Sequence, residues 1–277
     1  MQDPFVYCAE LVRQADRDRF LAALFAPAEQ RGALNALYAF NVEIARVRDV
    51  AREALPGEIR LQWWSDVLNG ERGGEAAANP TAAALLSAIE RHGLSTSSFL
   101  DLIEARRFDL YDEPMAAIAD LESYAKRTSS AVIALAAQIL GIDAQRAANP
   151  AGMAHAIAGL LRALPFRAAR HQLYVPAELL ERHGVRSDEI FAGQSPPGLN
   201  AALAELRNLG RHHLGATAEP LMALPRTVDP AFLPVALVRP SLDGLDRSDP
   251  FAPAELSPWR RQWLIWRAAR NPARITG

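Results

Sequence analysis

The sequence predicts an all-α protein, and three observations support this prediction. Apolar side chains recur at the three- and four-residue spacing of a helix face along most of the 277-residue chain. Glycine and proline fall mostly between these periodic segments, and the clean alternation that marks strands is absent. Because 50% of the residues are hydrophobic, a chain of this length can bury a sizeable core.

Helix signals follow one another along the first half of the chain. In NPTAAALLSAIERHG, Asn79 can cap a helix, Pro80 suits its first position, and Gly93 can end it. The segment DLESYAKRTSSAVIALAAQILG predicts a longer helix, with Asp120 as its cap and Gly141 at its end.

The second half predicts shorter helices. VPAELLERHG begins with proline and ends with glycine, residues 188–200 contain the loop signal GQSPPG, and prolines recur between Pro220 and Pro258. We therefore expect short helices and irregular connections in the proline-rich part. No repeat, low-complexity tract or long linker divides the sequence, so we expect a single domain over residues 1–277.

Composition argues against several classes of protein. A formal net charge of −2 gives no reason to expect a nucleic-acid partner. The one cysteine, Cys8, excludes an intramolecular disulfide and fits a reducing compartment. No apolar run approaches the roughly 20 residues of a transmembrane helix, and the N-terminal segment lacks the apolar core of a signal peptide. We expect a soluble protein on the cytoplasmic side.

The common catalytic and metal-binding motifs are missing, including the P-loop, the dinucleotide fingerprint, the nucleophile elbow and His/Cys metal spacing. His212 and His213 are adjacent, so on a helix they point about 100° apart and cannot chelate one metal together. Asp109 and Glu113 lie four residues apart in EARRFDLYDEP, which places them on one helical face. That face is either a cation site or a solvated helix end.

Two stretches carry residues that a buried helix does not ordinarily have. FNVEIARVRDV, residues 40–50, predicts an amphipathic helix that faces the interior, yet it contains Arg46 and Arg48. In RALPFRAARH, Pro165 stands inside a predicted helix. Proline there removes a backbone hydrogen bond and should kink or break the helix, at a cost on the order of 3 kcal/mol.

Three segments together resemble the squalene/phytoene synthase superfamily, whose enzymes are head-to-head prenyl transferases. They are YCAELVRQADRDRFLAALFAPAEQRGALNALYAFNVEIARVRD, EARRFDLYDEP with DLESYAKRTSSAVIALAAQILG, and GLLRALPFRAARHQLYVPAELL. Their order and spacing match from Tyr7 to Leu180, roughly two-thirds of the chain. The resemblance implies a single-domain, isoprenoid-synthase-like helical bundle around a central cavity.

The resemblance also implies that the family's metal site has been lost. Family members hold Mg²⁺ with two aspartate-rich motifs, and the ions help the substrate diphosphate to leave. The first motif falls on residues 45–49, where only Asp49 keeps a carboxylate, and the second on Ala163 and Arg167. Arginine repels a metal ion and does not deprotonate. We therefore expect no catalytic residue, metal site or cofactor, with Mg²⁺ bound only if the degenerate motifs still function.

The resemblance places ten candidate residues around the cavity of this degenerate site. They are Asn41, Ala45, Arg46, Arg48, Asp49, Arg162, Ala163, Arg167, Arg170 and Tyr174. The phrases FNVEIARVRD and LLRALPFRAARHQLYVPAELL are similar to a non-catalytic branch that includes a mitochondrial assembly factor of respiratory complex I. This similarity implies a pseudoenzyme, with a protein partner in a membrane respiratory complex and a place at the inner face of the membrane.

Alternatives to this function stay open. The chain can be a binding module that keeps the apolar cavity and holds an isoprenoid, quinone or other lipid, with arginines gripping an anion. It can also be a prenyl transferase with unusual metal or metal-free chemistry. Alternatively, Arg46 and Arg48 have a structural role and pair with acids such as Glu43 and Asp49.

The segment SPWRRQWLIWRAARNP predicts a C-terminal helix with Ser257 as its cap and Pro258 at its first position. Trp259, Trp263 and Trp266 then form one stripe, at spacing i, i+4 and i+7. The stripe either packs into the core or stays exposed and docks on a protein groove or a membrane interface. In the exposed case it supplies the peripheral membrane contact.

Overall fold

The computed structural model describes residues 2–51, 53–252 and 255–277. Within these ranges the regular elements are helices, together with one isolated bridge between Asp249 and Ala252. The all-α prediction is confirmed. The chain forms two compact units: unit 1 is Met1–Tyr111, Ala131–Gln145 and Leu224–Pro234, and unit 2 is Asp112–Ser130, Arg146–Ala223 and Val235–Gly277. The single domain over residues 1–277 stays a prediction.

Unit 1 is built around α3, which packs against α1, α7, α8 and α10. Its helices are α1 (Pro4–Ala15), α2 (Arg17–Ala23), α3 (Ala28–Ala45), α4 (Val47–Val50), α5 (Ala54–Leu68), α6 (Gly73–Ala78), α7 (Pro80–His92), α8 (Thr96–Arg107), the 3-10 turn η1 (Phe108–Leu110), α10 (Ala131–Ile139), η3 (Arg226–Val228) and α16 (Asp229–Phe232). The ring of Phe40 on α3 meets Trp64 of α5 at 4.9 Å and Phe99 of α8 at 5.5 Å, both edge to face. Aromatic pairs favour this geometry, so the buried trio anchors the helix that leads into the first candidate motif.

The local signals that delimit α7 act as expected. The Asn79 side chain accepts a hydrogen bond from the amide of Ala82 at 3.0 Å, and Pro80 is the first helical residue. Gly93 ends the helix with a φ of 59°, a left-handed conformation that costs glycine little. The predicted cap and terminator are confirmed.

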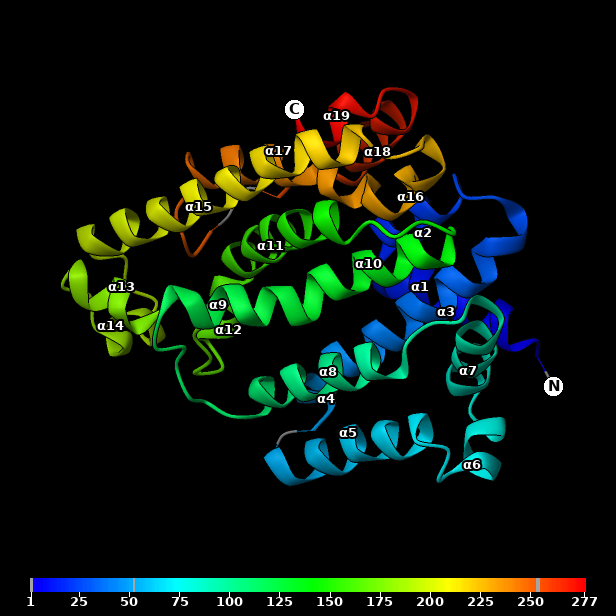
Figure 1. Ribbon diagram of the computed structural model, residues 1–277. Coiled ribbons are helices and arrows are strands. Elements are labelled where there is room, and N and C mark those ends of the chain that lie inside the picture. The colour runs from blue at the N-terminus through cyan, green and yellow to red at the C-terminus, as the bar shows by residue number, and fades with distance from the viewer. Residues whose placement is uncertain (1, 52, 253–254) are drawn as a thin grey trace. The chain divides into compact units, whose positions relative to one another are not determined.

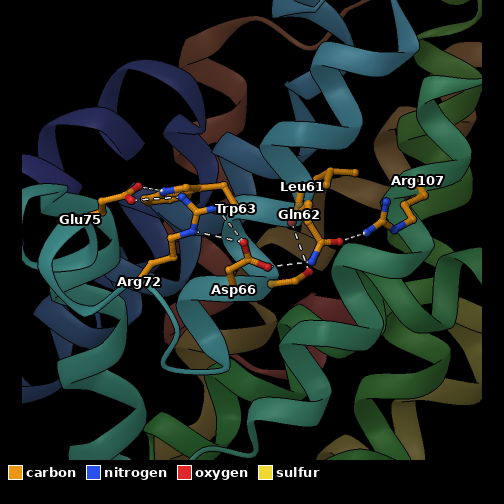
Figure 2. Close-up of polar contacts among 8 residues, drawn as sticks. Leu61, Gln62, Trp63, Asp66, Arg72, Glu75 and Arg107 are labelled. Carbon is orange, nitrogen blue, oxygen red and sulfur yellow. Dashed lines mark hydrogen bonds and ion pairs between the residues drawn. The ribbon is translucent and has the colours of Figure 1, made fainter.

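A polar cluster holds α6 against α5 (Figure 2). Arg72 forms ion pairs with Asp66 and Glu75, each at 3.1 Å, and the indole N–H of Trp63 donates to Glu75 at 2.8 Å. The Trp63 hydrogen bond, and next the Arg72 guanidinium, lower the pKa of the Glu75 carboxyl. Asp66 and Glu75 each form an ion pair with Arg72, so we assign the cluster a structural role.

Unit 2 is centred on α11 and the long helix α15, which run alongside each other (Figure 1). Its helices are α9 (Ile118–Ala125), the π turn η2 (Lys126–Ser130), α11 (Gln145–Arg162), α12 (Leu164–Ala168), α13 (Ala177–Arg182), α14 (Ser187–Phe191), α15 (Pro197–Met222), α17 (Val238–Leu245), α18 (Pro258–Arg270) and α19 (Ala273–Thr276), with η4 (Leu233–Leu237) leading into α17. Gly210 of α15 allows the close packing, because a Cβ there would lie 3.3 Å from side-chain atoms of both Ile157 and Leu242.

The π turn η2 interrupts the helix predicted over residues 120–141 and packs closely on α11. The Ser130 hydroxyl donates to the carbonyl of Asn149 at 2.7 Å. A Cβ at Gly152 would overlap Ser130, so only glycine fits there. Single π turns are rare and occur mostly as bulges inside longer α-helices, as here between α9 and α10.

Two other boundaries differ from prediction. Asp120 is not the cap of α9: the helix begins two residues earlier, and the Asp120 carboxylate accepts from the amide of Ala117 at 2.9 Å. Residues 188–200 are only partly a loop, because α14 and α15 occupy their two ends. In the proline-rich part that follows, the short helices η3, α16, η4 and α17 confirm the expected irregular architecture.

Candidate functional site

The first candidate motif lies at a break between two helices of unit 1. Helix α3 ends at Ala45 and α4 begins at Val47, with Arg46 between them at φ −100° and ψ 6°. The amide of Asp49 donates a hydrogen bond to the Arg46 carbonyl at 3.0 Å. This bond spans three residues, as in a 3-10 turn, rather than the four of an α-helix. A continuous helix through residue 50 is therefore wrong. The turn buries Val47 beside Gly57 of α5, ten residues further along the chain.

The side chains of the first motif differ in burial and in what they contact. Asn41 is buried within α3, Ala45 is half-buried, and Arg46 and Asp49 are exposed. Arg48 is half-buried, and its Nη1 donates to the carbonyl of Leu110 at 2.9 Å, which ties α4 to η1.

Glu43 was one of the acids expected to pair with these arginines. Its ion pair, 3.8 Å long, is formed instead with Arg60 of α5. The structure thus brings Arg48 to a backbone carbonyl of η1, and Glu43 to a different helix.

The second candidate motif lies at a break in unit 2, as Pro165 predicts. Helix α11 ends at Arg162, Ala163 has φ −82° and ψ −3°, and α12 begins at Leu164. Pro165 has no amide proton to donate to the carbonyl of Leu161, so the helical ladder is interrupted there. Ala163 and Arg167, the positions of the lost acids, lie one turn apart just after the break, since Ala163 caps α12 and its carbonyl accepts from the Arg167 amide at 3.0 Å.

Arg167 joins two of its neighbours in a small polar cluster. Its Nη1 donates to Oε1 of Gln172 at 2.9 Å, and its guanidinium carbon lies 5.4 Å from the centre of the Tyr174 ring. His171 makes this possible: it has φ 56°, which reverses the chain so that the Gln172 amide reaches the Arg167 carbonyl at 2.9 Å. Left-handed residues of this kind often end helices, although glycine is usual there.

The Arg167–Gln172–Tyr174 cluster forms the polar side of an apolar pocket in unit 2. Its other walls are mainly aliphatic and include Leu121, Ile157, Leu160, Leu164, Val175 and Leu206. The cavity volume is about 10 Å³, which is room for roughly one water molecule. Ligand pockets usually measure about 300–1,000 Å³, so an isoprenoid enters only if the side chains move apart.

The other two candidate arginines of unit 2, Arg162 and Arg170, are not among the residues that line this pocket. Arg162 is half-buried and Arg170 is exposed, whereas Tyr174 is buried and its ring lies 5.7 Å from that of Tyr124. The sequence pattern did not point to Gln172, although a polar residue directly before the apolar LYV run was a usable signal. Leu110 carried no signal, because it acts through its backbone carbonyl.

The proposed carboxylate pair in EARRFDLYDEP does not form. Asp109 is buried in η1 and pairs with Arg106 at 3.0 Å, and the chain leaves the helical conformation at Tyr111. Asp109 and Glu113 therefore do not share a helix face, and that prediction is wrong. Across the described ranges, the structure shows no group of three His, Cys, Asp or Glu side chains that could hold a metal ion.

The tryptophan stripe lies on the surface of unit 2. Trp259, Trp263 and Trp266 of α18 are 81%, 47% and 46% exposed, so the core alternative is wrong. Ser257 caps the helix as predicted, since its side chain accepts from the amide of Arg260. Among the helices of the described chain, none combines the length and hydropathy that crossing a membrane requires.

Comparisons with known proteins point to one family. A family model described as squalene/phytoene synthase matches residues 12–267. The chain is 30% identical over 250 residues to "NADH dehydrogenase (ubiquinone) complex I, assembly factor 6" of Rattus norvegicus, which covers 89% of this chain and 75% of that protein. The Homo sapiens protein of the same name is 30% identical over 246 residues, covering 88% and 74%. Among solved structures, a dehydrosqualene synthase in complex with ligand has a TM-score of 0.81 at 17% identity, covering 96% of this chain and 95% of the other.

Proposed function

Because the chain belongs to the squalene/phytoene synthase family, we propose that it is a pseudoenzyme of this family that acts as an assembly factor or scaffold for respiratory NADH:quinone oxidoreductase, complex I. The observation that carries this proposal is the state of the two candidate motifs. Of the aspartate positions of the family pattern only Asp49 keeps an acid; residues 45–49 cross a helix break, and residues 163–167 begin at one.

Electrostatics argues against a magnesium site at these positions. Mg²⁺ takes about six oxygen ligands and relies on carboxylates for charge. Asp49 is the one acid left, and the guanidinium groups of Arg46 and Arg167 occupy two of the vacated positions. A fixed positive charge raises the free-energy cost of placing a divalent cation nearby. Without a bound Mg²⁺, nothing here neutralises a substrate diphosphate as it leaves in the way the metal does.

The relatives' names support the choice of partner. Two proteins named as complex I assembly factor 6 are 30% identical to this chain over most of its length. We propose a protein partner within that membrane complex, with this chain bound peripherally at the cytoplasmic, inner face of the membrane.

The test of the assembly role is a gene deletion in the native host. Deletion should lower the NADH:quinone oxidoreductase activity of isolated membranes and the amount of assembled complex, and the wild-type chain should restore both. Succinate dehydrogenase activity in the same membranes is the control and should not change. Normal complex I levels in the deletion strain contradict the assembly role.

A second experiment tests the pseudoenzyme. Purified chain is incubated with farnesyl or geranylgeranyl diphosphate and Mg²⁺, and diphosphate release is measured. We expect none, and no rescue by Ala45→Asp or Ala163→Asp, because the helix break at residue 163 remains. Turnover that a chelator abolishes would establish a prenyl transferase with degenerate motifs.

A second candidate function is isoprenoid or lipid binding in the pocket of unit 2, which the composition of its walls favours although its side chains must move apart to admit a ligand. Its aliphatic walls suit a hydrocarbon chain, and Arg167 offers a guanidinium that can bind an anionic head. Farnesyl diphosphate should then raise the thermal unfolding midpoint more than farnesol does, and Arg167→Gln should remove the difference. Arg186→Gln, an exposed arginine outside the pocket, is the matched control. Equal midpoints with and without either compound exclude this function.

A further inference from the structure

Helix α18 presents two opposite faces. Ile265 and Ala268 are 1% and 0% exposed and fix the helix to unit 2. With about 100° per residue, the three tryptophans fall within an arc of about 60°, on the side roughly opposite to Ile265 and Ala268. The stripe of Trp259, Trp263 and Trp266, here called the tryptophan face, is therefore turned away from the protein.

Arginines flank the tryptophan face and are held against its rings. The guanidinium carbon of Arg267 lies 5.0 Å from the centre of the Trp263 ring, and that of Arg270 lies 4.6 Å from the Trp266 ring. Cation–π contacts of this kind keep the charge at the level of the indoles. Arg260 is exposed and, by helical spacing, lies on the flank that Arg267 also occupies.

The charge of this segment contrasts with that of the whole chain. Residues 256–277 contain five arginines and neither Asp nor Glu, whereas the whole chain has a formal net charge of −2. Three of the chain's five tryptophans lie in the same segment. All three of these tryptophans and four of the five arginines lie on α18, and the fifth, Arg274, lies on α19.

We propose that the tryptophan face of α18 binds an anionic lipid bilayer, with the indoles at the headgroup level and the arginines on lipid phosphates. An indole has an apolar body and one N–H donor, which suits the boundary between acyl chains and headgroups. Arginine matches phosphate with paired donors, and its positive charge complements an anionic leaflet. An interfacial helix of this type lies flat, so it need not have the length of a membrane-spanning helix.

This inference deepens the peripheral membrane contact of the proposed function by naming the surface that makes it. It can be tested separately, because vesicle binding needs no respiratory complex. A chain that binds vesicles but leaves complex I unchanged on deletion would retain the lipid surface and lose the assembly role.

The experiment is flotation of the full chain with two kinds of vesicle at low salt. One contains phosphatidylcholine with about a third phosphatidylglycerol, and the other contains phosphatidylcholine alone. The chain should float with the anionic vesicles only, and salt at about 0.5 M should weaken the binding. Failure to float with anionic vesicles, or equal flotation with both kinds, overturns the proposal.

Variants locate the binding surface. The pair Trp263→Ala and Trp266→Ala should weaken binding by about tenfold or more, because apolar area is lost from the interface. Phe25→Ala is the matched control. Phe25 is an aromatic residue of unit 1 that is 45% exposed, close to the 47% and 46% of Trp263 and Trp266. Binding that survives the double substitution, or that falls equally in the control, overturns the assignment to α18.

Charge variants and fluorescence complete the test. Arg260→Gln with Arg270→Gln should weaken binding by about fivefold for each charge, whereas Arg186→Gln should not. If the tryptophan variants fail to fold, the emission of the wild-type chain decides: a blue shift on anionic vesicles supports the proposal, and an unchanged spectrum overturns it. Binding to polyglutamate without binding to vesicles would assign the surface to an acidic protein instead.

Discussion

Replacing Gly152 with alanine tests the close packing of α11 on the π turn η2. An added Cβ would lie nearer than 3.0 Å to three atoms of Ser130, namely Cα, N and Oγ. Non-bonded carbon atoms normally stay about 3.5–4.0 Å apart. Two of the three Ser130 atoms belong to the backbone, so no change of rotamer relieves the overlap. The two segments must instead separate by about 1 Å or more.

The expected cost follows from three contributions. Overpacking in a well-packed region costs about 1–3 kcal/mol, and a backbone clash belongs at the upper end of this range. Separation also weakens the 2.7 Å hydrogen bond from Ser130 to Asn149, which contributes about 1 kcal/mol. Alanine offsets about 0.5–1 kcal/mol, because it favours a helix interior more than glycine does. The free energy of unfolding should therefore fall by about 2–3 kcal/mol, and the thermal midpoint by about 4–10 °C.

Urea and thermal unfolding, followed by far-ultraviolet circular dichroism, measure this effect. Gly159→Ala is the matched control, because Gly159 lies on the same helix and nothing approaches within 4 Å of its added Cβ. That variant should be neutral or more stable by up to about 1 kcal/mol. If Gly152→Ala unfolds at the same midpoint as Gly159→Ala, the steric reasoning is refuted.

Three further predictions concern single side chains. Arg46→Ala should change the free energy of unfolding by less than about 0.5 kcal/mol. Arg48→Ala should lower it by about 1–2 kcal/mol, because it removes the hydrogen bond to the Leu110 carbonyl. Equal losses for the two variants in urea titrations would contradict this. Burial raises the pKa of the Cys8 thiol to about 12, so near pH 8 a thiol reagent should modify the folded chain at least about a thousandfold more slowly than the chain in urea. Burial also raises the pKa of the Asp229 carboxyl. Between about pH 4 and this raised pKa, the folded state holds a proton that the unfolded state has released. The free energy of unfolding therefore falls as the pH rises through this range. Asp229→Asn should flatten that dependence in urea titrations, and an unchanged slope would count against it.

Helix ends were the part of the fold most accessible from sequence. Asn79, Gly93 and Ser257 act as predicted, because a cap or a left-handed terminator depends on a few neighbouring backbone groups. The break ahead of Pro165 follows from one missing amide proton. In each case the determinant lies within the segment itself.

Features set by distant packing could not be read in the same way. The turn at Arg46 depends on the burial of Val47 beside Gly57, ten residues further on. A tryptophan stripe has the same spacing in a core helix and in an exposed one. Which alternative holds is decided by Ile265 and Ala268, whose burial turns the stripe outward.

The two units are interleaved along the chain, since each is assembled from three separate segments. No single cut releases one unit intact, so deletion mapping of a partner site would remove pieces of both. A chain that stops before Ser257 illustrates the difficulty: it loses α19, which packs on α15 and supplies the Thr276 carbonyl that accepts from Arg239 at 3.1 Å. Loss of binding in that truncated chain would report damage to unit 2 as readily as loss of α18. Point substitutions on exposed faces are therefore the way to map what this protein touches.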